Sequence, residues 1–160
     1  MTATPVRHPG YPPTISSLLA ASIDHLSDAI LITEGETTKG PDGIRRISFV
    51  NEAYVKMTGF SREEAIGETP GITIGPGSDR SQLMELERAR AELRPKRIEV
   101  LKYRKDGSTF WTELDVVPLF DEQGRNSHFL GVLRDITDRR LLQARLTEAD
   151  RLASIGTLAA

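Results

Sequence analysis

The chain has 160 residues, a formal net charge of −2 at pH 7 and no cysteine. The length suits one domain of ordinary size with helical extensions. The charge gives no basic footprint for nucleic acid, and the missing cysteine excludes disulfides, thiolate metal sites and thiol nucleophiles. No apolar run is long enough to span a bilayer, and residues 1–13, rich in Pro and Gly, hold no export signal. We therefore expect a cytoplasmic protein with a disordered tail over 1–13 that contacts neither nucleic acid nor membrane.

The first half of the chain predicts a helix, a hairpin and a further run of helices. Asn51 and Asp79 are N-cap residues, Ser61 with Glu64 forms a capping box, and Gly59 is a helix stop. The expected elements are a helix over 14–27, strands over 29–33 and 47–50, short helices over 52–57 and 61–67, and a helix over 79–93.

The second half predicts strands over 98–104, 109–119 and 128–136, with turns at Asp106-Gly107 and Gln123-Gly124. A long charged helix follows over 138–160. This order implies an α+β fold, in which a five-stranded antiparallel sheet carries helices on one face.

Both faces of the last three strands are apolar, whereas a half-exposed antiparallel sheet would be polar on one face. The set facing one way includes Phe110 and Leu114, and the set facing the other includes Trp111 and Val117. The second face must therefore be covered, either by the N-terminal helix or by another subunit. We expect a homodimer formed through the N-terminal helix, the outer sheet face and the C-terminal helix.

The C-terminal helix carries a short heptad seam. Its apolar residues lie at spacings of 4, 3 and 4 and are Leu142, Leu146, Ala149 and Ala153. Charged residues flank this seam, so the pattern favours a coiled coil. The alternative is an amphipathic helix packed on its own domain, because the seam covers only about three heptads. The apolar stripe continues to Ala160 without a stop signal, so we expect either a partner chain or a further domain beyond it.

Four motifs in this order resemble a PAS domain over about residues 15–140, with the sensor domain itself at 28–137. They are Val50-Asn-Glu-Ala-Tyr54, Thr58-Gly-Phe-Ser61, Tyr103-Arg-Lys-Asp-Gly107 and Gly131-Val-Leu-Arg-Asp-Ile-Thr137. Within PAS domains the chain resembles the light-oxygen-voltage (LOV) subgroup, which binds flavin and forms a photoadduct through a cysteine. The segment 150–160 also resembles the stretch just upstream of the phosphoacceptor histidine in bacterial sensor histidine kinases.

The resemblance to LOV domains does not extend to their flavin-binding residues. The photoactive cysteine corresponds to Pro70 and the neighbouring phosphate-binding arginine to Gly71. The flavin-contacting polar side chains correspond to Lys102, Thr112 and Leu133. The helix over 79–93 has no histidine to serve as an axial ligand for haem, and no His, Asp or Glu residues show metal-ligand spacing. We therefore predict neither flavin nor haem nor a metal, and leave room for an unidentified small ligand.

Alternation along the strands defines a candidate ligand pocket. Its members are Val100, Lys102, Phe110, Thr112, Leu114 and Leu133. Lys102 shares a face with Ile98 and Val100, so its ammonium group could pair with an anionic ligand while Thr112 adds a hydrogen bond. The alternative is that Lys102 extends to the rim or meets a structural carboxylate.

The segment Asp135, Ile136, Thr137 resembles the motif that joins a PAS domain to its output helix, with Arg104 or Lys105 as the partner of Asp135. A simple helix cap would explain the same residues. We predict the sensor module of a cytoplasmic two-component histidine kinase, which signals through this junction to a dimeric coiled coil. The alternatives are a ligand-free dimerisation and relay module and, less favoured, a photosensor that binds flavin non-covalently. The chain itself has no phosphoacceptor histidine or ATP site and is not expected to be an enzyme, whereas its parent is expected to be a kinase.

Overall fold

The computed structural model describes residues 13–159, so the expected disorder of the tail falls outside the described residues except at position 13. The elements in chain order are α1 (Pro13–Asp24), β1 (Ala29–Glu34), β2 (Ile47–Val50), α2 (Glu52–Thr58), α3 (Arg62–Ala65), η1 (Pro70–Thr73), α4 (Arg80–Ala91), β3 (Lys96–Tyr103), β4 (Thr109–Phe120), β5 (Asn126–Asp135) and α5 (Thr137–Ala159). Within the described part of the chain, no helix has both the length and the apolarity needed to cross a membrane.

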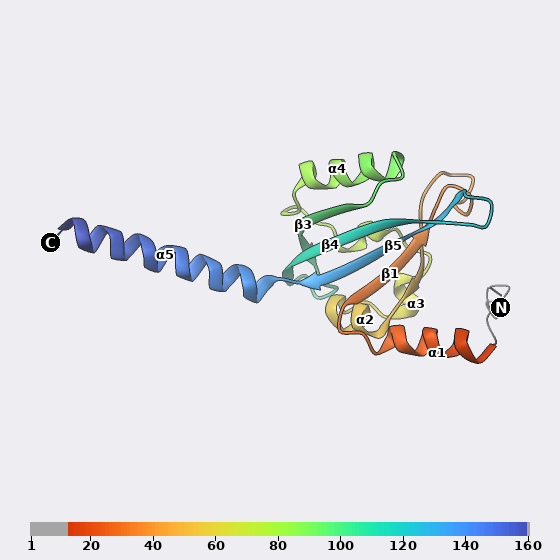
Figure 1. The fold of residues 1–160 in the computed structure, drawn as a ribbon, viewed down its shortest axis with the longest axis horizontal. Coiled ribbons are helices and arrows are strands. Elements are labelled where there is room, and N and C mark those ends of the chain that lie inside the picture. The colour runs from red at the N-terminus through yellow and green to blue at the C-terminus, as the bar shows by residue number, and fades with distance from the viewer. Residues whose placement is uncertain (1–12, 160) are drawn as a thin grey trace.

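One antiparallel sheet of five strands, in the order β2-β1-β5-β4-β3, organises the domain. The last strand in sequence, β5, is the central one, because it pairs with β1 on one side and β4 on the other. Helices α2, α3 and α4 contact strands β1, β2 and β3 respectively, and Figure 1 shows the sheet with these helices around it. The predicted α+β fold is confirmed.

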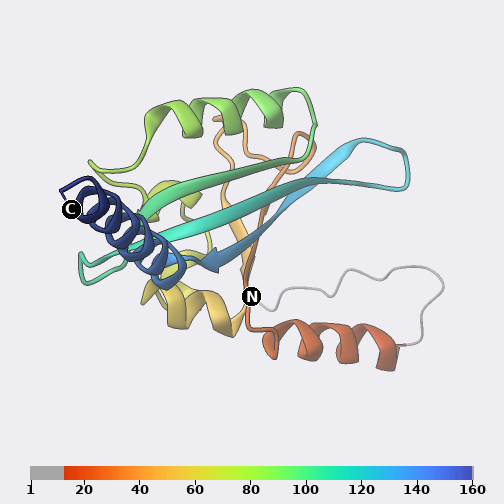
Figure 2. The ribbon, with the colours of Figure 1, turned by 60° about the vertical axis from the view of Figure 1, so that its left-hand side comes forward.

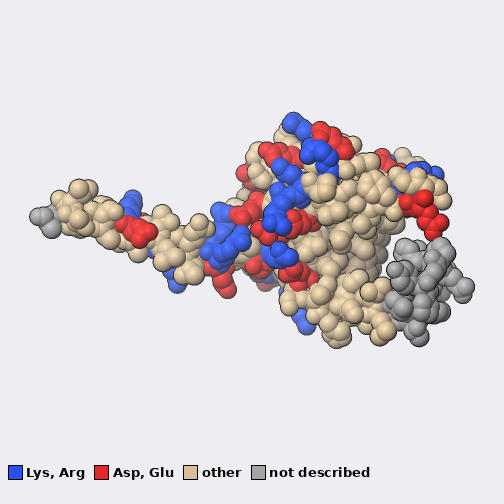
Figure 3. All heavy atoms as spheres, viewed as in Figure 1, with Lys and Arg blue, Asp and Glu red and all other residues tan. Residues whose placement is uncertain are grey.

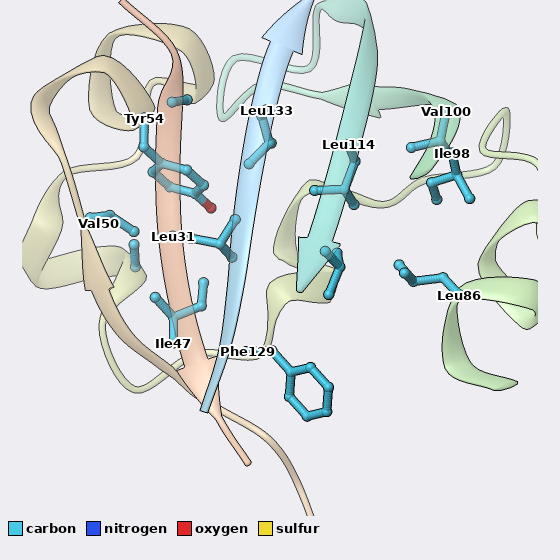
Figure 4. Close-up of a cluster of buried hydrophobic side chains, with 13 residues drawn as sticks. Leu31, Ile47, Val50, Tyr54, Leu86, Ile98, Val100, Leu114, Phe129 and Leu133 are labelled. Atoms are coloured by element: carbon cyan, nitrogen blue, oxygen red, sulfur yellow. The ribbon is translucent and has the colours of Figure 1, made fainter. Parts of the chain in front are cut away.

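The buried side of the sheet and the helices enclose one apolar core. Figure 4 shows side chains from both sheet halves and from α2 and α4 meeting there. The largest of them are Tyr54, Phe129, Leu133 and Ile47, each almost completely buried. Together with the caps that start α2, α3 and α4, this core holds the helices in place over the strands.

Asn51 joins three elements through one buried amide. Its Oδ1 accepts hydrogen bonds from the backbone N–H groups of Ile30 (2.8 Å) and Tyr54 (3.0 Å). Its Nδ2 donates to the carbonyls of Ile23 (3.0 Å) and Asp28 (3.1 Å). The predicted N-cap of α2 therefore also fixes α1 and β1.

Helix α1 lies beside α2 and does not cover the outer face of the sheet (Figures 1 and 2). Its last residue, Asp24, pairs with Arg62 at 2.7 Å and accepts a hydrogen bond from the Glu52 N–H. On the outer face Val117 remains 38% exposed and Trp111 is half-buried. The apolar patterning allowed the outer face to be covered either by the N-terminal helix or by another subunit, and in the structure the N-terminal helix does not cover it.

Helix α5 leaves the body of the domain and projects away from it (Figure 1). Every residue from 141 to 158 is exposed, including Leu142 and Leu146, each 59% exposed. In this structure α5 is therefore not an amphipathic helix packed on its own domain, which was the alternative reading of its apolar stripe.

Candidate functional site

A small internal cavity of about 20 Å³ lies between the sheet and the helices. That volume holds about one water-sized group. Its apolar wall comes mainly from Leu31, Leu114, Phe129 and Leu133, and its polar wall from Thr33, Tyr54, Thr73, Arg90 and Lys102. Three of the six predicted pocket residues line it, namely Lys102, Leu114 and Leu133. Pro70, the position that corresponds to the photoactive cysteine of LOV domains, lines it as well.

Lys102 points into this interior and is only 5% exposed. Its Nζ donates to Thr73 Oγ1 at 2.8 Å. Among the described residues no carboxylate oxygen lies within 4.0 Å of it, so the structure offers no ion-pair partner. Burial, together with the charge of Arg90, lowers the pKa of Lys102 to about 8.

A second cation, Arg90, approaches the cavity from α4. Its guanidinium pairs with Glu87 at 2.5 Å and lies 6.0 Å from the centre of the Phe129 ring. Arg45 stands over the same ring at 5.3 Å. The Nε atoms of both arginines are buried without a hydrogen-bond partner among the described residues. Burial lowers the pKa of Arg90, although the guanidinium stays charged in the neutral range.

The sequence analysis missed Arg90, Thr73 and Tyr54. A signal for Arg90 was present, because Leu83, Leu86 and Arg90 lie at helical spacing and Leu86 is fully buried.

Three predicted pocket residues, Val100, Phe110 and Thr112, are buried but do not line the cavity. The Thr112 hydroxyl donates to the backbone carbonyl of Arg134 at 3.0 Å. The Thr112 hydroxyl thus serves the pairing of β4 with β5, and Thr112 does not line the cavity with Lys102. Phe110 instead lies under the Arg104 guanidinium, 4.6 Å from ring centre to Cζ.

The junction between β5 and α5 is held by polar contacts. Arg104 Nη2 and Asp135 Oδ2 are 3.3 Å apart, and Arg104 Nε donates to the Met57 carbonyl at 3.0 Å. Asp135 Oδ1 accepts from the Thr137 N–H at 2.9 Å, which is a helix cap. The other candidate partner, Lys105, pairs with Glu64 instead.

Strand β4 is tied to the same junction through the backbone of Trp111. Its N–H donates to Thr137 Oγ1 at 2.9 Å, and its carbonyl accepts from the Ile136 N–H at 2.8 Å. The Arg140 guanidinium stacks 3.7 Å from the Trp111 ring centre. Glu99 on β3 pairs with Arg140 at 2.9 Å. The first turn of α5 is thus bound to two strands, and Figure 3 shows charged side chains gathered where α5 leaves the body.

Comparison with known proteins places these features in a family. The family model described as PAS domain matches residues 27–138. The blue-light photoreceptor of Listeria monocytogenes is 30% identical over 132 residues, which cover 80% of this chain and 50% of that protein. Blue-light-activated histidine kinase 1 of Erythrobacter litoralis is 36% identical over 92 residues, 58% of this chain and 26% of the kinase. The chain therefore spans half or less of these relatives.

The solved structures agree on the fold. The LOV domain of the Erythrobacter litoralis EL346 blue-light-activated histidine kinase aligns with a TM-score of 0.63 at 26% identity, covering 71% of this chain and 99% of that one. An RNA-binding LOV receptor aligns with a TM-score of 0.75 at 23% identity, covering 98% of this chain and 43% of the receptor. At that identity the second likeness shows the fold alone.

These comparisons correct the expectation about cofactors. The relatives are blue-light receptors, and a further neighbour, with a TM-score of 0.66 at 21% identity over 89% of this chain and 97% of that one, is a LOV domain studied with a flavin analogue. Predicting that flavin is absent gave too much weight to individual side chains. What the residues do exclude is the thiol adduct, because the sequence has no cysteine. A flavin would also need the cavity to widen, since the side chains around it leave room for about one water-sized group.

The match to the family model, the sheet order and the structural neighbours all lead to one assignment. The chain is a signal-transduction sensor domain, and its sequence is related to that of blue-light-activated histidine kinases. It belongs to the PAS domain family, and its relatives and structural neighbours include LOV domains.

Proposed function

We propose that this chain is the sensor segment of a histidine kinase and that it passes a change in its interior to α5 through the junction at Arg104, Asp135 and Thr137. Relatives that are blue-light-activated histidine kinases support a kinase as the parent protein. Flavin, bound without a thiol adduct, is the first cofactor to test.

The observation that carries this proposal is the double backbone connection of Trp111 to the start of α5. Trp111 lies on β4, and three residues further along the same strand Leu114 lines the cavity. A shift of β4 would therefore reach both the cavity wall and the Ile136 and Thr137 hydrogen bonds. Packed elements of this kind switch between discrete arrangements because a close-packed interior does not deform continuously.

The output would require two copies whose α5 helices pair. The predicted seam at Leu142, Leu146, Ala149 and Ala153 is exposed along its whole length. An apolar stripe on a projecting helix gains stability when a second helix buries it. The half-buried outer face at Trp111 and Val117 would extend the same interface.

The absence of native cysteine allows a direct test with a single spin label. We would replace the exposed Gln143 by cysteine in the full chain and measure the distance between labels in the dimer by double electron–electron resonance. The expected result is one defined distance, which shifts when FMN is bound and illuminated. Arg104→Gln should broaden the distribution, because Asp135 loses its ion pair, and Arg97→Gln on the exposed side of β3 is the matched control.

The outcomes separate the alternatives. A chain with no dipolar coupling between labels is a monomer and contradicts the paired output helix. A dimer in which Arg104→Gln and Arg97→Gln behave alike contradicts the junction. Retention of flavin absorption after gel filtration decides the cofactor, and a defined dimer whose distances respond to no ligand would instead support the relay alternative.

A further inference from the structure

The cavity has an unusual charge balance for the interior of a domain. Among the residues that the structure describes, its lining includes two cationic side chains, Lys102 and Arg90, and no carboxylate. The remaining polar groups are hydroxyls, which can donate hydrogen bonds, and Figure 4 shows the Tyr54 ring reaching towards Leu31 with its hydroxyl leading. Every polar side chain around this space can therefore donate to an acceptor placed in it.

The nearby carboxylates pair with the arginines and leave Lys102 without an ionic partner among the described residues. Glu87 pairs with Arg90, and its side chain is 57% exposed. Glu36 pairs with Arg45 and is also exposed. Lys102 has the Thr73 hydroxyl as its only hydrogen-bond partner among the described residues. Buried charges are normally paired, so an ammonium group with only a neutral partner marks a place for an anion.

We infer that this cavity is a binding site for one single-atom anion, a halide, held by the Lys102 ammonium and the Arg90 guanidinium. The hydroxyls of Tyr54 and Thr73 would donate to the same anion. The volume of about 20 Å³ sets the size, because it takes about one water-sized group. This site rests on the proposed function and adds the chemical class of a ligand to it. Binding of the anion can be measured separately from any change in α5.

Binding should depend on pH through Lys102. The titratable groups that line the cavity with Lys102 are Arg90 from α4, which pairs with Glu87, and Tyr54 from α2. Burial raises the pKa of Tyr54 to about 12, so its phenol stays neutral. Lys102, with its pKa near 8, is thus the group that loses charge between pH 7 and 10. Affinity for the anion should fall over that interval, and a bound anion should raise the pKa of Lys102 in turn.

The test is a titration of the full chain with sodium chloride and, separately, sodium bromide, followed by amide signals in two-dimensional NMR. Sodium gluconate, too large for the cavity, keeps the ionic strength constant. We expect saturable shifts centred on β3, η1 and α4. Lys102→Met and Arg90→Met should each weaken binding about tenfold or more, because each removes a charge-assisted contact. Lys96→Met, the same change on β3 at a residue paired outside with Glu85, should bind like the wild type.

Several results would overturn the inference. These are shifts that do not saturate, shifts that Lys102→Met and Arg90→Met leave unchanged, or binding that is constant from pH 7 to pH 10. A parallel titration with FMN separates the two ligand chemistries, because FMN binding that blocks chloride would place both in this cavity. If chloride binds but the distances between α5 labels do not change, the anion site stands and the proposed coupling fails.

Discussion

Replacing Lys102 by methionine should stabilise the ligand-free domain at neutral pH. The pKa of Lys102 falls from 10.5 to about 8 on burial. At ~1.4 kcal/mol for each pKa unit, carrying this charge at pH 7 costs the fold ~3 kcal/mol. Methionine fills a similar volume without a charge, while the hydrogen bond to Thr73 that is lost had contributed ~1 kcal/mol. The net gain is therefore about 2 kcal/mol, or roughly 4–8 °C in Tm for a chain of this size.

The pH dependence identifies the cause. In the wild type the unfolded chain binds more protons at Lys102 than the folded chain does between pH 8 and 10.5, so stability should rise with pH over this interval. Lys102→Met should lack that rise, and the advantage of the variant should shrink towards pH 10.5. Urea unfolding followed by circular dichroism, in gluconate buffers at several pH values, measures both curves. Lys96→Met controls for the loss of a lysine from the same strand.

Two results would refute this reasoning. If Lys102→Met is less stable than the wild type at pH 7, the ammonium contributes more through its hydrogen bond and packing than its burial costs. If the variant keeps the same advantage at every pH, the gain comes from methionine packing and not from removal of charge.

Three further changes test the fold around the site, each by urea unfolding. Asn51→Ala should cost about 2–4 kcal/mol, because it leaves buried backbone groups of three elements without partners, and a loss under 1 kcal/mol would show that water replaces the amide. Gly75→Ala should destabilise by at least ~1 kcal/mol, because a Cβ there would lie 2.5 Å from the Tyr103 ring, and unchanged stability would mean that the ring moves aside freely. Gly156→Ala should stabilise the helical state of α5 by ~1 kcal/mol, because a Cβ there meets nothing within 4 Å. The far-ultraviolet circular dichroism signal of the helix should also increase, and no increase would indicate that α5 is frayed at this position.

The sequence predicted the order and type of the elements well, because the local signals were strong. Asn51, Ser61 and Asp79 start α2, α3 and α4 as their capping chemistry indicates. The end of α4 was predicted two residues late. Leu93 adopts a positive φ of 51° after the helix ends at Ala91, and an apolar residue gives no warning of that conformation.

The candidate site was predicted less well. Whether a residue lines the cavity depends on its position along the strand as well as on the face of the sheet to which its side chain points. Strand alternation correctly turned Val100, Lys102 and Leu114 to the buried side. It could not tell that Val100 packs in the core beside the cavity whereas Lys102 and Leu114 line it. Arg90 was not among the predicted pocket residues, because the pocket was derived from strand alternation and Arg90 lies on a helix, four positions after the buried Leu86.

The way α5 is anchored fixes the helical phase of anything that continues it. Hydrogen bonds and ion pairs hold its first turn to β3 and β4, while every residue from 141 to 158 is exposed. Each residue of an α-helix advances the angle by about 100°, so a single insertion after Thr137 would turn a following element to a different side. Insertions of about seven residues would nearly restore it. Exchange of this domain between signalling proteins should therefore succeed or fail with the length of the connecting helix, in steps of the heptad, more than with the identity of the residues along it.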